Sequence, residues 1–191
     1  MRDQIYKQVQ SIRPLDELEN NHKQDCLNWI ESGVELCRIS KPDNPPIHLV
    51  SYFVLVDGDA ILLVDHINAQ LWLPTGGHVD VGEHPKLAAI REAKEELGIN
   101  AELVFEHPIF ITVTDTVGLT AGHTDVSLWY VLKGSREKEY VYDQSEFKQI
   151  KWFKLDEIPL QKSEPNITRF LQKLALMKDR HIYRGKHEVA R

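Results

Sequence analysis

Three glutamates near the middle of the chain have a spacing that could bind a divalent cation. Glu92, Glu95 and Glu96 are related as i, i+3 and i+4, so a helix would place their carboxylates on one patch. Like charges at this spacing destabilise a helix by roughly a few tenths of a kcal/mol per pair. Oxygen ligands in an acidic group suit a hard ion such as Mg²⁺, which bridges carboxylates to substrate phosphates. The alternative is a solvated acidic helix face, because glutamate is a good helix former.

The residues around these glutamates form a longer pattern. Read from Gly77 to Ile99, the sequence GHVDVGEHPKLAAIREAKEELGI matches Gly-x5-Glu-x7-Arg-Glu-U-x-Glu-Glu-x-Gly-U, where U is aliphatic. Seven fixed residue types at background frequencies of about 7% each would match by chance on the order of 10⁻⁸ per register. The segment resembles the Nudix box, the signature of the Nudix hydrolase family. Its one departure is Ala93, which is smaller than the usual aliphatic residue.

The resemblance implies a role for each charged residue of the box. It makes Glu95 and Glu96 the core metal ligands, with Glu92 as a further ligand or as the base that activates water. Arg91 would orient the glutamates through a salt bridge. Glu83 would support the loop or bind a further metal. The implied cofactor is Mg²⁺, with Mn²⁺ as a substitute.

Residues outside the helix complete the expected site. Gly76 and Gly77 allow close backbone approach, and in the family a carbonyl of this loop coordinates the metal. Relatives carry an additional acid before the last strand, as ligand or base, and Glu146 occupies that place. The competing acids are Glu137, Glu139 and Asp143.

Two histidines are candidates for the substrate pocket. His78 follows the Gly-rich loop, and His123 precedes a predicted strand. An ordinary surface or hydrogen-bonded histidine is the alternative for both. Cys26 and Cys37 are the only cysteines, and no CxxC pair or local Cys/His cluster predicts a zinc site. They are interpreted as buried or free thiols in a reducing compartment.

The helix that carries the glutamates is predicted over Lys86–Leu97, with Gly98 as its C-terminal cap. At 100° per residue, Leu87, Ile90, Ala93 and Leu97 form a stripe that should face the core. The glutamates would then lie on nearly the opposite side.

The other predicted elements alternate strands and helices. Asp57-Gly58 is a hairpin turn signal between two apolar runs. The strands are expected at His48–Val56, Ala60–Asp65, Gln70–Pro74, Ala101–Glu106, Ile109–Thr116, Thr124–Lys133 and Phe147–Leu155, and a last helix at Asn166–Met177. This order fits an α/β/α sandwich around a mixed, partly antiparallel sheet. The resemblance to the Nudix family covers roughly Pro46 to Leu176.

Two short amphipathic helices are predicted before the prolines at 45 and 46. Their apolar residues repeat at helical spacing from Ile5 to Ile12 and from Leu15 to Trp29. Packing on the main domain is favoured; a homodimer contact or a substrate lid is the alternative. The expected organisation is an extension at 1–45, a Nudix domain at 46–178 and a polar tail at 179–191.

Composition limits the partners. The net charge is −6 over 191 residues, which gives no electrostatic reason to expect binding to a nucleic acid polymer. A polyanionic substrate would therefore need a metal or a local cationic pocket. No apolar segment resembles a signal peptide or a membrane span, so the expectation is a cytoplasmic protein with no membrane partner.

The implied function is hydrolysis of a pyrophosphate bond in a nucleoside diphosphate linked to another moiety. A nucleoside triphosphate, as in MutT-type members, is preferred, because Thr114–Val117 lacks the proline or tyrosine typical of the ADP-ribose and dinucleoside-polyphosphate branches. The extended motifs of the NADH and coenzyme A branches are also missing. The alternatives are another derivative such as ADP-ribose, or a nucleotide-sensing protein without turnover.

Overall fold

The computed structural model describes residues 1–41, 44–117, 119 and 121–188. Its helices are α1 Arg2–Ser11, α2 Glu17–Glu31, α3 Pro85–Leu97 and α4 Ile167–Glu188, and its strands are β1 Ile47–Asp57, β2 Ala60–His66, β3 Trp72–Leu73, β4 Thr75–His78, β5 Phe110–Asp115, β6 Thr124–Lys133 and β7 Phe147–Lys154. The predicted hairpin is confirmed, with Asp57 paired to Ala60.

The strands form one mixed sheet. Its main path runs β3-β2-β1-β6-β5, with β4 paired to β1 and β7 paired to β2. The β1–β6 pair is parallel, and the other strand pairs of the described chain are antiparallel. The long parallel ladder fixes which residues at the start of β1 face those at the start of β6.

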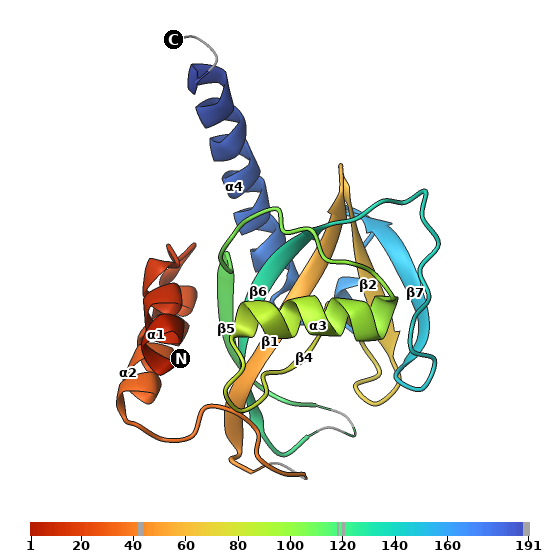
Figure 1. The fold of residues 1–191 in the computed structure, drawn as a ribbon. Coiled ribbons are helices and arrows are strands. Elements are labelled where there is room, and N and C mark those ends of the chain that lie inside the picture. The colour runs from red at the N-terminus through yellow and green to blue at the C-terminus, as the bar shows by residue number, and fades with distance from the viewer. Residues whose placement is uncertain (42–43, 118, 120, 189–191) are drawn as a thin grey trace.

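Helices cover both faces of this sheet (Figure 1). Alternate residues of a strand point to opposite faces, and in β6 Leu128 and Tyr130 pack with α1, α2 and α3, whereas Trp129 and Val131 pack with α4. On the α4 side, the Phe170 ring stacks on Trp129 at a centroid distance of 5.0 Å. The predicted α/β/α sandwich is therefore confirmed.

The two N-terminal helices are an integral part of the core. Ile5, Val9, Cys26 and Ile30 are buried in the same cluster as the sheet residues. Because this stripe packs within the chain, it supports the favoured interpretation of an intramolecular contact; a homodimer stays a prediction. Helix α2 begins later than expected, at Glu17, and its cap is Asp16, which accepts a hydrogen bond from the backbone of Glu19.

Charged contacts link α2 to α4. Arg169 of α4 donates to both carboxylate oxygens of Asp16. Lys173 forms an ion pair with Glu19, and both of these side chains are buried. Because two helices distant in sequence share a buried ion pair, the extension is joined to the last helix as well as to the sheet.

The orientation predicted for α3 is only partly correct. Ala93 and Leu97 are buried as predicted, but Leu87 is 55% exposed, and the buried residues of the helix are Pro85, Ala88, Ala89, Ala93, Glu96 and Leu97. The alanines allow the helix to approach the sheet closely, which turns Glu92 and Glu96 toward β4 rather than away from the core. The predicted cap at Gly98 is confirmed, with a φ of 67°, and the helix begins at Pro85, one residue before the predicted start at Lys86.

Two further predictions differ from the structure. Residues 101–106 do not form a strand and contribute a single bridge, between Leu103 and Leu132. The last helix continues from Ile167 to Glu188, so much of the expected C-terminal tail is helical. In Figure 1 this helix extends beyond the sheet at its C-terminal end. No helix among the described residues is long and apolar enough to cross a membrane.

Candidate active site

The box residues line a cleft of about 780 Å³. Strand β4 supplies Gly76 and Gly77 to its wall, and α3 supplies Arg91 and the glutamates at 92, 95 and 96. Glu146, which directly precedes β7, lines the same cleft. The fold therefore brings together residues from three separate elements that the sequence assigned to one site.

The two glycines leave no room for side chains. A Cβ at Gly76 would lie 2.2 Å from the backbone oxygen of Ser51, and the φ of Gly76 is +142°. A Cβ at Gly77 would lie 2.3 Å from Oε1 of Glu92. A methyl group at position 76 would overlap the backbone of β1, and one at position 77 would displace the Glu92 carboxylate, so the glycines let the α3 carboxylates lie close to the β4 backbone. The Gly76 N–H donates to Oε2 of Glu96 at 2.9 Å.

Arg91 connects the acidic residues of the box. Its guanidinium donates to both oxygens of Glu83, at 3.0 and 2.9 Å. It also donates to Glu92 at 2.6 Å, to Glu95 at 3.2 Å and to the backbone oxygen of His78 at 3.1 Å. Its planar fork can satisfy several oxygens at once. The geometry thus agrees with the orienting role that the resemblance implied.

Burial perturbs the acid groups of the box. Burial raises the pKa of Glu92, with repulsion from Glu95 and Glu146 adding to it against the opposing effect of Arg91. Burial raises the pKa of Glu96 well above its usual range, and the nearby Glu92 and Glu146 carboxylates add to this. For Glu83, burial is outweighed by hydrogen bonds from Arg91, so its pKa falls. Arg91 therefore stabilises the charge of Glu83 more fully than that of the deeper glutamates.

A hard divalent cation fits this donor set. Carboxylate oxygens of Glu92, Glu95, Glu96 and Glu146 line one cleft, and their mutual repulsion is part of the perturbation described above. Both oxygens of Glu83 accept from Arg91, so Glu83 acts as a support for Arg91 in this arrangement. A cation among the remaining carboxylates would relieve the repulsion that Arg91 leaves uncompensated.

The loop acids that compete for the additional site differ in position. Glu146 is in the cleft, whereas Glu139 lines a different cavity. Asp143 uses Oδ1 to accept from Ser145. Glu146 thus lines the cleft with the box glutamates, while Asp143 lies near Glu96, whose backbone oxygen accepts from the Asp143 backbone N–H.

Sequence reasoning missed Glu164, an acid in the same cleft. Glu164 is 5% exposed and accepts hydrogen bonds from the backbone and side chain of Asn166. Burial raises the pKa of Glu164 to about 7. A Glu-Pro-Asn turn gives no local signal of burial, so this residue became visible only once α4 was placed.

The cleft also contains cationic side chains from outside the box. Arg38 and Lys41, which belong to the N-terminal extension, line it together with the acidic residues of the box. Burial lowers the pKa of His78 to about 3, and the positive charges of Arg38 and Lys41 add to this effect. His78 is therefore neutral at pH 7, and the extension contributes charge to the cleft.

Both predicted substrate-pocket histidines, His78 and His123, line the cleft. They lie together with two residues that the sequence did not single out, His48 and Asp125. His48 faces Asp125 in the parallel β1–β6 register. No local Cys/His motif encodes this group, because strand pairing creates it.

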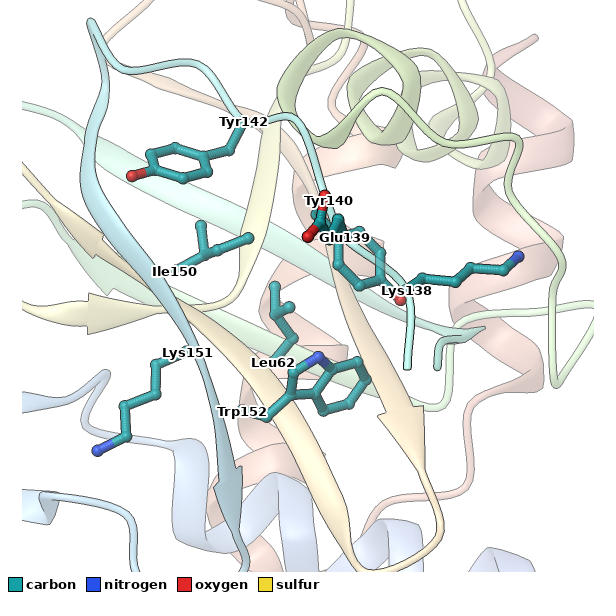
Figure 2. A pocket seen from close by; sticks show the side chains of 8 residues that line it. All are labelled: Leu62, Lys138, Glu139, Tyr140, Tyr142, Ile150, Lys151 and Trp152. Carbon is teal, nitrogen blue, oxygen red and sulfur yellow. The ribbon is translucent and has the colours of Figure 1, made fainter. Parts of the chain in front are cut away.

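A second cavity, of about 370 Å³, lies apart from the box (Figure 2). It is lined by Leu62, Lys138, Glu139, Tyr140, Tyr142, Ile150, Lys151 and Trp152. Figure 2 shows the Trp152 ring beside Leu62, with the tyrosines on the neighbouring segment. Since it contains none of the box carboxylates, the larger cleft is the candidate active site.

Comparisons with known proteins agree with the fold and the cleft. The sequence model of the NUDIX domain matches residues 47–174. A Bacillus subtilis (strain 168) protein provisionally named 8-oxo-dGTP diphosphatase is 44% identical over 62 residues, which cover 30% of this chain and 42% of that protein. The match thus spans less than half of this curated relative.

Solved structures resemble the chain over most of its length. A NUDIX-family hydrolase from Clostridium perfringens has a TM-score of 0.54 and 28% identity, over 68% of this chain and 97% of that one. A NUDIX hydrolase from Nitrosomonas europaea, with a TM-score of 0.56 and 22% identity over 68% of this chain and 89% of that one, shares the fold. The α/β/α sandwich with its acidic cleft is thus that of a Nudix protein. The chain belongs to the Nudix hydrolase family.

Proposed function

We propose that this protein hydrolyses a pyrophosphate bond in a nucleoside triphosphate, with Mg²⁺ as its cofactor. The observation that carries the proposal is the joint placement of Glu92, Glu95, Glu96 and Glu146 with Arg91 in one cleft. Bound there, Mg²⁺ would neutralise charge on the diphosphate bridge and favour in-line attack by water.

The chain's own residues divide the work. Glu95 and Glu96, with a carbonyl of the Gly76 loop, would hold the cation. Arg91 holds the Glu92 and Glu95 side chains in place. Glu92 and Glu146 are the two candidates for the group that orients or deprotonates the attacking water. Their distinct positions, one on α3 and one before β7, allow each to be tested separately.

The charge distribution supports a polyanionic substrate. Arg38 and Lys41 provide positive charge in a cleft otherwise rich in carboxylates. Some phosphate oxygens of a triphosphate could bind the cation, and the other negatively charged phosphate oxygens could contact Arg38 and Lys41. His78 and His123 lie in the same cleft and remain proposed substrate contacts. The name of the partially matching Bacillus relative makes 8-oxo-dGTP a compound to include among the substrates tested.

The test is product identification on a substrate panel. The purified chain is incubated with nucleoside triphosphates, 8-oxo-dGTP and ADP-ribose, with Mg²⁺, with Mn²⁺ and with a chelator. The expected result is a nucleoside monophosphate and pyrophosphate from a triphosphate, with activity lost in the chelator. Faster turnover of ADP-ribose than of any triphosphate would overturn the substrate assignment.

A nucleotide-sensing protein without turnover is the competing function. That outcome would appear as tight binding of one nucleotide and no products from the whole panel. The retained box carboxylates argue against it, because each is placed in the cleft or bonded to Arg91. If the panel does show turnover, exchange of Glu92 and Glu146 for glutamine, one at a time, would identify the base from the larger loss of turnover.

A further inference from the structure

A histidine cluster at one end of the cleft forms a compact donor set separate from the box. His48, His78, His123 and Asp125 each offer one ligand atom, and these atoms all lie within 4.8 Å of one another. His48 is fully buried, and the side chains of His123 and Asp125 are 7% and 15% exposed. Three imidazoles and one carboxylate are ligands typical of Zn²⁺ and related transition metals, whereas Mg²⁺ prefers oxygen alone.

The strand pairing explains why these residues meet. His48 of β1 is opposite Asp125 of β6, and His78 of β4 is opposite Val50, two residues further along β1. His123 lies two residues before Asp125 and therefore on the same side of the chain as that aspartate. The cluster thus joins the ends of β1, β4 and β6 rather than a single flexible loop.

The hydrogen bonds of two histidines direct their lone pairs to the same carboxylate. Nδ1 of His48 is 2.9 Å from the backbone oxygen of Pro45, which can only accept, so the proton of the neutral ring is on Nδ1. Its Nε2 then points its lone pair at Oδ1 of Asp125, 3.5 Å away. Metal-binding histidines are commonly oriented in this way, with the second nitrogen donating to a carbonyl.

His123 repeats the arrangement. The hydroxyl of Thr116 donates to the backbone oxygen of His123 at 3.0 Å and accepts from the backbone N–H of His123 at 3.4 Å, and it also lies 3.4 Å from Nδ1 of His123. With the proton of the neutral ring on Nδ1, Nε2 of His123 offers a lone pair, and it lies 3.2 Å from the same oxygen of Asp125. In that tautomer two imidazole nitrogens and a carboxylate oxygen face one another, and a single cation could bind all three.

Protonation of both rings is a poorer solution than one metal ion. Two imidazolium rings would then stack, since the ring centroids of His48 and His123 are 4.7 Å apart with an interplanar angle of 26°. Like charges in such a stack repel each other. A buried Nε2 of His78, which has no hydrogen-bond partner among the described residues, adds a third nitrogen that an ion could use.

An anion fits the cluster less well. Arg38 and Lys41 line the same cleft, and their charge would attract one. However, the cluster presents lone pairs and the negative charge of Asp125, and these repel an anion at its centre. Anion binding is therefore the competing outcome of the test.

We infer that His48, His78, His123 and Asp125 form a second metal site, for Zn²⁺ or a similar transition-metal ion, distinct from the carboxylate site of the box. Four protein ligands without an open position are typical of a structural site, so with the ion bound His78 and His123 would hold the metal rather than contact substrate. The bound ion would join three strand ends and hold the segment that follows Gly77. In a tetrahedral site with bonds of about 2.0–2.1 Å, ligand atoms lie roughly 3.3 Å apart, so the cluster would contract slightly around the ion.

Zinc titration by calorimetry, with Mg²⁺ held saturating, tests the inference. Mg²⁺ occupies oxygen sites and leaves imidazole sites free. The expected result is one Zn²⁺ per chain and a raised melting temperature for the wild type. Asp125→Asn and His123→Ala should each weaken Zn²⁺ binding by more than tenfold, whereas Glu95→Gln in the box and His66→Asn, at a cleft histidine outside the cluster, should retain it.

The outcomes separate this site from the proposed hydrolysis. No Zn²⁺ uptake by the wild type in Mg²⁺, or equal uptake by folded Asp125→Asn and His123→Ala variants, would overturn the inference. Circular dichroism establishes whether each variant is folded. Asp125 lies on β6 and His123 precedes this strand, so if one variant misfolds, the other still tests the inference. Binding of inorganic pyrophosphate without metal, lost in His123→Ala, would assign the cluster to anions instead. Turnover with Mg²⁺ is measured separately and bears only on the box.

Discussion

Glu164 should make the metal-free protein less stable as the pH rises through neutrality. Its carboxyl group is buried, and burial raises its pKa from the usual 4.5 to about 7. Between these two values the folded chain holds a proton that the unfolded chain has released. The free energy of unfolding therefore decreases with pH in this interval, because the slope is proportional to the protons bound by the unfolded state minus those bound by the folded state.

The size of the effect follows from the shift. At about 1.4 kcal/mol per pKa unit, a shift from 4.5 to about 7 corresponds to roughly 3 kcal/mol in total, present below pH 4.5 and lost as the pH passes through 7. Part of this loss occurs below pH 5. The free energy of unfolding should therefore fall by roughly 2–3 kcal/mol between pH 5 and pH 8. Glu164→Gln has no proton to lose, and its stability should lack this component.

Urea unfolding of both proteins at pH 5, 6, 7 and 8, with a chelator present, measures the difference. The box glutamates also titrate in the metal-free chain, but they are common to both proteins and cancel in the comparison. Glu157→Gln, at an exposed position, controls for the loss of one charge. If the stability difference between wild type and Glu164→Gln stays constant within about 0.5 kcal/mol from pH 5 to pH 8, the burial argument for Glu164 is wrong.

Four shorter predictions test the site and its support. Glu95→Gln should lower turnover at least a hundredfold in steady-state kinetics, because it removes a charge from the proposed metal site. It should change the free energy of unfolding in urea by less than about 0.5 kcal/mol, because the Glu95 side chain is 59% exposed. Turnover like that of the wild type would contradict the ligand assignment. Arg91→Ala should lower the free energy of unfolding by about 3–5 kcal/mol, since it leaves the poorly exposed carboxylates of Glu83 and Glu92 uncompensated. Lys94→Ala, on the exposed side of α3, should lower it by under about 0.5 kcal/mol. Equal losses in urea unfolding would refute the role of the Arg91 ion pairs. Gly76→Ala should abolish Mg²⁺ binding or folding, because a backbone oxygen occupies the space, and calorimetric Mg²⁺ binding like that of the wild type would show that β4 can move. Lys173→Met should destabilise the chain by about 3–5 kcal/mol by stranding its buried partner on α2, and a loss under 1 kcal/mol in urea unfolding would contradict the ion pair.

Local sequence signals predicted the elements of the fold well where they were strong. The Asp57-Gly58 turn, the uninterrupted β6 run and the Gly98 cap each reflect short-range backbone preferences, and the structure contains all three. Residues 101–106 have strand-like composition, but β propensity depends on a partner, and here only Leu103 finds a bridge. Pairing is a tertiary property that composition does not encode.

The buried face of α3 was predicted only in part, at Ala93 and Leu97, for a related reason. Leu87 was predicted in the core because its side chain is large and apolar. However, β4 beside α3 contains two glycines, so the helix packs close to the strand and only small side chains fit between them. Alanines such as Ala89 and Ala93 provide that surface, and Glu96 is buried with them because its carboxylate reaches the β4 backbone. The site motif was readable from spacing, whereas its direction relative to the core depended on the neighbouring strand.

The tight contact between β4 and β1 also limits how the cleft can be altered by protein engineering. Position 76 has no volume for a side chain, and position 77 has none without displacing Glu92. Mutational libraries intended to change substrate preference would lose most members if they varied these positions. Arg38 and Lys41 border the same cleft from outside the box, and randomising them would sample new ligand contacts while leaving the hydrolytic apparatus intact.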